Sequence, residues 1–236
     1  MADFTAGLKA RRLPVAIVLL VVQGVGLVWV LAAVATAGEP LPSGRAVAAS
    51  LAAGAAGAIA LGSFYRALAI GTMSVVAPIS ATGVALPVVV GVATGDQLSA
   101  LVSAGLVITV LGVLLASREQ HEDSRVAAAG RTSIALALLA ALGFGSYFVL
   151  SDVAADESVL WLLALARLIV VPVLAAVMLS RRTARPGTGD VLPLVVAGTL
   201  DVTATGLYGL ANREGALSVV SVVGSLYPVA TVLLAR

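Results

Sequence analysis

Long apolar segments alternate with short polar connections along most of the chain. Eight of these segments contain about 20 or more mostly apolar residues, the length that a helix needs to cross a bilayer. The short alternating segments typical of a membrane β-barrel are missing, so helices are the expected backbone solution in lipid. The pattern predicts an all-α integral membrane protein with spans at Leu13–Ala37, Ala46–Tyr65, Ala67–Gly95, Leu98–Ser117, Thr132–Ser151, Ser158–Ser180, Val191–Asn212 and Gly215–Ala235.

The composition agrees with a chain that is surrounded by lipid. Hydrophobic residues make up 60% of the sequence and charged residues only 11%, whereas a soluble domain carries about 25% charged residues. Cysteine is absent, which excludes disulfides and thiolate metal sites. No basic face with interleaved aromatic residues is present, so we expect no nucleic-acid partner. We also expect no cofactor and no metal.

The longest polar connection, residues 118–131, divides the chain into two similar halves. We predict a first repeat over 1–117, a polar linker over 118–131 and a second repeat over 132–236. The halves match at an offset of about 144 residues, and five spans per repeat would give the two repeats opposite orientations in the membrane. The matched positions are Gly71, Ser74, Val75 and Val76 with Gly215, Ser218, Val219 and Val220.

The same offset leads to an expectation about both ends of the chain. It places the partner of the span at Thr132 about a dozen residues before Met1. We therefore expect Met1–Leu8 to be the remnant of a first helix. The partner of Leu98–Ser117 would lie beyond Arg236, so we expect the second repeat to be cut within its ninth helix and to lack the tenth.

Several stretches carry recognisable motifs. Phe64–Ser80 has the sequence FYRALAIGTMSVVAPIS, and Leu207–Ala211 (LYGLA) is followed by GALSVV at 215–220 and SLYPV at 225–229. Together with the turn Gly95–Ser99 and the stretch Ala2–Phe4, they resemble the EamA-type transporters of the drug/metabolite transporter (DMT) superfamily. The resemblance implies a ten-helix inverted-repeat (5+5) fold and transport of small metabolites, such as amino-acid-like or drug-like compounds.

Two charged residues lie deep within predicted spans. Arg167 and Asp201 are each near the middle of a span, and the two spans are consecutive and antiparallel. A charge at this depth is costly and normally faces the bundle interior or a cavity. Asp201 is a candidate for proton coupling or for binding a substrate amine, with Arg167 as its partner or as a carboxylate anchor. The alternative is an ion pair that only fixes helix packing.

Further candidates come from helix breaks and from nearby hydroxyl groups. A proline inside a helix frees a backbone carbonyl, and such breaks can expose backbone groups to a central site. The predicted helix-break residues are Pro78, Pro87 and Pro228. The full set of substrate- or ion-binding candidates is Asp201, Arg167, Gln23, Tyr65, Tyr208, Ser80, Ser221, Ser225 and Tyr227. For the prolines and tyrosines, shape and an interfacial position are equally open interpretations.

Enzymatic classes have little support in this sequence. The only histidine, His121, lies in the linker, so a Ser–His pair within the membrane is not expected. No GxxxxGK[ST] loop is present, so transport would be secondary, driven by an ion such as the proton or by the substrate's own gradient. A non-transporting remnant or helical assembly partner is the alternative function. Gly91 and Gly95 form a GxxxG pattern that is compatible with a homodimer.

The basic residues also predict an orientation. Nine of them lie in the first, fifth and seventh connections, against Arg45 and Arg213 on the opposite side. The positive-inside rule places the nine in the cytoplasm, whereas the family resemblance implies cytoplasmic termini and hence the reverse. We follow the charge count. Lys9 is the only lysine among 14 basic residues, a bias typical of high-GC bacteria, so we expect a multi-pass protein of a bacterial plasma membrane.

Overall fold

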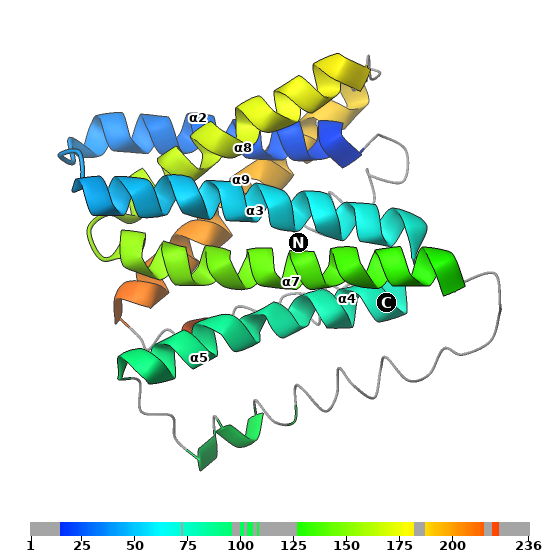
Figure 1. The fold of residues 1–236 in the computed structure, drawn as a ribbon. Helices are drawn as coiled ribbons and strands as arrows, with labels where there is room; N and C mark the ends of the chain where they lie inside the picture. Colours follow the sequence, from blue (N-terminus) through cyan, green and yellow to red (C-terminus); the bar gives the residue numbers. More distant parts are fainter. Residues whose placement is uncertain are drawn as a thin grey trace. The chain divides into compact units, whose positions relative to one another are not determined.

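The computed structural model describes residues 15–71, 73–95, 100–101, 103–105, 108, 127–181, 187–214 and 219–221. Every secondary-structure element within these residues is helical (Figure 1). Six helices of this described part are long and apolar enough to cross a membrane. The prediction of an all-α multi-pass membrane protein is therefore confirmed. The elements are α2 (Val15–Ala37), α3 (Gly44–Ile70), α4 (Met73–Ala81), η1 (Thr82–Val84), α5 (Ala85–Thr94), α7 (Ala127–Ala155), α8 (Val159–Arg181) and α9 (Thr188–Glu214).

The helix boundaries follow the predicted spans except at two places. The predicted break at Arg66 is wrong, because α3 continues through this residue to Ile70 and ends before Gly71. One arginine does not end a helix when its side chain is exposed, as that of Arg66 is. Helix α7 begins at Ala127, inside the segment predicted as linker. The predicted span Leu98–Ser117 and the last span lie mostly outside the described residues, as do the segments before residue 15.

The chain divides into two compact units, and the first contains α2, α8 and α9 with the start of α3 and the end of α7. Helix α2 packs against both α8 and α9 (Figure 1). Val18 and Val22 of α2 form a buried cluster with Leu194 and Ala197 of α9. Gly198 allows the close approach, because a Cβ atom there would lie 2.7 Å from the carbonyl oxygen of Val22. The helices of this unit thus pack through small residues, as membrane helices commonly do.

The second unit contains residues 56–149, which include the rest of α3, α4, η1, α5 and the body of α7, and also residues 219–221. Ala67, Val76 and Ala137 form its buried cluster. Gly143 of α7 lies so close to α3 that a Cβ atom would be 2.9 Å from that of Ala60. Gly95 ends α5 with a left-handed φ of 116°, which favours glycine at this position. The second glycine of the GxxxG pattern is thus a helix cap, and the predicted homodimer stays a prediction.

The outer faces of the helices are apolar. Leu179, Leu192 and Val28 are among the large hydrophobic side chains that remain exposed. An exposed apolar surface of this extent would be unfavourable in water, whereas lipid is a suitable solvent for it. The polar groups of interest therefore lie inside the units or at the helix ends.

The contact between α3 and α8 provides a test of this packing. A Cβ atom at Gly54 would lie 2.5 Å from the carbonyl oxygen of Ala166, whereas Gly62 on the same helix has no described atom within 4 Å of that position. We expect Gly54→Ala to lower the free energy of unfolding by about 1–3 kcal/mol, because the two backbones must separate. Gly62→Ala is the matched control and should leave stability unchanged or raised. Thermal unfolding in detergent measures both, and equal effects would contradict the close packing.

Candidate functional site

The first unit contains a buried ion pair between α8 and α9. Arg167 is only 5% exposed, and its Nη2 atom lies 3.1 Å from Oδ2 of Asp201. The same nitrogen donates a hydrogen bond of 3.0 Å to Oγ1 of Thr205, and Nη1 donates one of 3.4 Å to the carbonyl oxygen of Leu163. Both charged residues lie well inside apolar helices, far from the helix ends. A charge in such a place needs a partner and further hydrogen bonds, and this arrangement supplies both.

Helix α2 forms the third wall around the guanidinium group. A Cβ atom at Gly26 would lie 2.7 Å from Nε of Arg167, so any larger residue here would require the arginine side chain to shift. Nε is buried and has no hydrogen-bond partner among the described residues. Gln23 lies three residues earlier on the same face of α2, and its buried Oε1 atom also lacks a partner within this part of the chain.

A polar stripe extends from the ion pair along α9. Thr205, Tyr208 and Asn212 follow Asp201 at intervals of four, seven and eleven residues, which places all four on one helix face. Asn212 is 5% exposed, and neither atom of its amide group has a hydrogen-bond partner in the described structure. An unpaired buried amide costs about 1–3 kcal/mol for each group. Such a group is accounted for most simply by a water molecule or a ligand that binds to it.

The other predicted candidates divide between the two units. Gln23, Arg167, Asp201 and Tyr208 belong to the first unit, whereas Tyr65, Ser80 and Ser221 belong to the second. Ser80 is buried, and its hydroxyl donates a hydrogen bond of 3.5 Å to the carbonyl oxygen of Ala137. Ser221 is fully buried. Three predicted residues lie outside the described part of the chain, namely Ser225, Tyr227 and Pro228.

The two remaining predicted break residues flank a short irregular segment. Pro78 lies inside α4, and Pro87 is the third residue of α5. Between them, η1 departs from the α-helical pattern over three residues. A proline at position 87 cannot donate to the carbonyl of Gly83, which lies within η1. The interruption thus belongs to the second unit, and Ser80 is the buried candidate hydroxyl next to it.

Comparison with known protein families identifies the second half of the chain. Residues 131–236 match the EamA-like transporter family. This part of the chain is similar to the EamA-like transporters. No curated protein and no solved structure matches the chain. The resemblance is therefore confirmed for residues 131–236. The matched family is one of membrane transporters of the general DMT type and not of enzymes.

The EamA-like domain includes both members of the ion pair, and it also contains residues that sequence reasoning missed. Thr205 and Asn212 were not among the candidates, although their helical spacing from Asp201 could have identified them. Gly26 was missed because its role depends on where α2 crosses α8, which no local pattern reveals. The described residues contain no group of three or more His, Cys, Asp or Glu side chains that could hold a metal ion.

The two partners of the ion pair should respond unequally to substitution. Asp201→Leu leaves the buried Arg167 charge uncompensated, so we expect a loss of about 3–5 kcal/mol in unfolding free energy. Arg167→Leu should cost less, because the Asp201 side chain is 29% exposed and its charge is less completely enclosed by the packed helices. The double variant should recover much of the loss. Unfolding of the purified protein in mixed micelles measures these differences, and strict additivity would show that the two charges do not interact.

Proposed function

We propose that the chain is a secondary transporter of small metabolites, either amino-acid-like or drug-like, that works by alternating access at a midplane site between two inverted repeats. The observation that carries this proposal is the hydrogen-bonded Arg167–Asp201 pair inside two apolar helices of an EamA-like domain. Ionisable residues at membrane depth commonly belong to substrate or ion pathways. The family match supports transport in general, and the buried pair suggests where the transported species binds.

The unequal exposure of the two charges suggests a separate role for each. Asp201 is the more accessible partner and is suited to exchange a proton or to bind a cationic group of the substrate. Arg167 is held by Leu163 and Thr205 as well as by Asp201, so it keeps a defined position when the carboxylate changes partner. Binding at Asp201 then competes with Arg167, which links occupancy of the site to the packing of α8 on α9.

The unpaired polar atoms around the pair support a site that binds polar ligands. Nε of Arg167 and Oε1 of Gln23 offer a donor and an acceptor next to α2, and Asn212 offers both along α9. A purely structural ion pair has no need of additional unsatisfied groups, because each of them destabilises the fold. Water or substrate would supply the absent hydrogen bonds. This excess of unsatisfied groups favours the transport role over simple helix packing.

The proposal includes the setting in which the protein works. The plasma membrane of a bacterium is the proposed location, the lipid bilayer is the solvent of the apolar helix faces, and the proton is the proposed coupling ion. A proton-coupled carrier needs one accessible carboxylate that alternates between charged and neutral forms. Asp201 meets this requirement and lies near the middle of its span, whereas Asp152 and Asp190 lie near the ends of theirs.

Replacement of Asp201 by asparagine tests the transport role directly. The amide keeps the shape and an acceptor for Arg167 but cannot bind a proton or carry charge. We expect Asp201→Asn to reduce substrate-driven proton movement in proteoliposomes at least tenfold, while the protein remains folded by size-exclusion chromatography. A panel of amino acids and cationic drugs with an internal pH dye provides the measurement.

Asp156→Asn is the control, because Asp156 is an exposed carboxylate in a loop. This variant should transport at the original rate. Undiminished transport by Asp201→Asn would remove Asp201 from the mechanism. Absence of proton movement with every compound in the unsubstituted protein would instead support the non-transporting alternative.

A further inference from the structure

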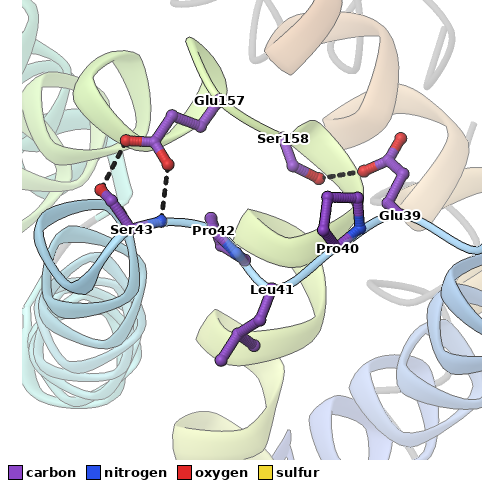
Figure 2. Close-up of a pocket in the computed structure, with 7 residues that line it drawn as sticks. All are labelled: Glu39, Pro40, Leu41, Pro42, Ser43, Glu157 and Ser158. Atoms are coloured by element: carbon purple, nitrogen blue, oxygen red, sulfur yellow. Dashed lines mark hydrogen bonds between the residues drawn. The ribbon is translucent and has the colours of Figure 1, made fainter.

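Two loops at one end of the first unit hold each other through carboxylate–serine contacts (Figure 2). Ser43, at the end of the loop after α2, donates a hydrogen bond of 2.6 Å from its hydroxyl and one of 2.7 Å from its backbone N–H to Glu157. Glu157 lies in the short loop between α7 and α8. In return, the hydroxyl of Ser158 donates to the carboxylate of Glu39. The four residues surround a shallow pocket of about 350 Å³.

Each serine also caps a helix. The hydroxyl of Ser43 accepts a hydrogen bond of 3.3 Å from the N–H of Ala46 at the start of α3. The hydroxyl of Ser158 accepts one of 3.1 Å from the N–H of Trp161 at the start of α8. A helix N-terminus attracts negative charge, so each carboxylate lies where it is electrostatically favoured. Each loop thus supplies a serine that caps the helix following it. Each also supplies a carboxylate that accepts a hydrogen bond from the serine of the other loop.

The contacts join parts of the chain that are far apart in sequence. Glu157 and Ser43 are 114 residues apart, and Ser158 and Glu39 are 119 apart. One loop belongs to the first half of the chain and the other to the EamA-like domain. Trp161 strengthens the link, because its indole N–H donates a hydrogen bond of 3.3 Å to the backbone oxygen of Glu39. A movement that separates the two halves at this end must break all of these bonds.

The loops lie at the end of the unit where α8 begins. Ser158 precedes Arg167 by nine residues on the same helix, a distance of roughly 13 Å along the axis. The end of α9 lies at the same level, because Gly209 packs against Val159. This is the side of the membrane with few basic residues, which the charge count predicts to be external. Solvent that enters past the loops would therefore meet the polar stripe of α9.

The Glu157–Ser43 contact is sensitive to protonation of Glu157. The hydrogen bonds from the side chain and then the backbone of Ser43 lower the pKa of Glu157 below 4.5, and the charge of Arg45 adds to this effect. The charged groups near Glu157 are Arg45 on α3, Glu39 across the pocket and Asp156 next to it in sequence. Because the pKa is lowered, the contact contributes its full stability above the ordinary pKa. That stability is lost as the pH falls through the lowered value.

We propose that the Glu157–Ser43 and Glu39–Ser158 contacts form a latch. It holds the two loops together at neutral pH and loosens when Glu157 is protonated, which opens this end of the unit toward Arg167. This inference rests on the proposed alternating-access function. The latch itself can be measured without any transport, so its failure can be told apart from the failure of that function.

The absence of cysteine allows a clean test of access. Gly206→Cys introduces a single thiol beside the ion pair, where a Cβ atom would meet Leu163 at an ordinary 3.7 Å. In lipid nanodiscs at pH 7, a charged, membrane-impermeant methanethiosulfonate reagent should label this thiol at least fivefold faster when Glu157 is replaced by Gln. Asp156→Asn removes a neighbouring carboxylate that bonds neither serine, and it should leave the labelling rate unchanged. Equal rates for Glu157→Gln and the original loop would overturn the latch.

A second measurement keeps the proposal testable if Glu157→Gln does not fold. The sequence holds two tryptophans, so Trp29→Phe leaves Trp161, a member of the latch, as the only indole fluorophore. Its emission should change reversibly on acidification, with a midpoint below the ordinary pKa of a glutamate side chain. Asp156→Asn should retain the transition. Emission that is constant down to pH 3, or a transition that survives unchanged in the double variant Glu39→Gln/Glu157→Gln, would overturn the latch.

Results of the two lines of experiment can be separated. Unimpaired transport by Asp201→Asn together with faster labelling of Glu157→Gln would reject the transport site and support the latch. Loss of transport in Asp201→Asn with a labelling rate that is independent of Glu157 would support the site and reject the latch.

Discussion

The buried charge of Arg167 is the constraint on which the first unit depends. A guanidinium group that is 5% exposed among apolar helices must be compensated within hydrogen-bond reach. This requirement fixes α9 so that Asp201 and Thr205 face α8, and it requires glycine at position 26 so that α2 can approach. Helices that contact each other only through apolar side chains could shift along one another. Such a shift costs little, because lipid tails and leucine side chains are equally apolar. The charge removes that freedom and defines one arrangement of the three helices.

Much of this architecture follows from the sequence, because lipid imposes a simple rule. A helix that crosses a bilayer needs about 20 apolar residues, so span length alone predicts α2, α7, α8 and α9. The pairing of Arg167 with Asp201 was also predictable, because they are the only charges deep within consecutive antiparallel spans. The end of α3 was not predictable from charge, since an exposed arginine continues a helix and Gly71 follows its end.

The contacts that sequence reasoning missed depend on long-range geometry. Gly26 matters only because α2 crosses α8 at Arg167, and the sequence contains 24 glycines with nothing local to distinguish this one. In the sequence, Glu39 and Glu157 are ordinary charged residues of predicted loops. Each accepts a hydrogen bond only because the other loop places a serine next to it. Asn212 is different, because its spacing from Asp201 was visible in the sequence. The distinguishing fact, an amide without partners, requires the packed structure.

Helix α8 connects the two polar features of the first unit. Its N-terminal cap, Ser158, belongs to the loop contacts, and Arg167 belongs to the ion pair. A hydrogen-bonded helix of nine residues transmits displacement with little loss, because its backbone bonds resist bending. If separation of the loops lets α8 shift along α2, the fit of Arg167 against Gly26 changes with it. With that coupling, the reciprocity of linked equilibria requires a ligand that displaces Arg167 from Asp201 to alter the stability of the loop contacts by the same free energy.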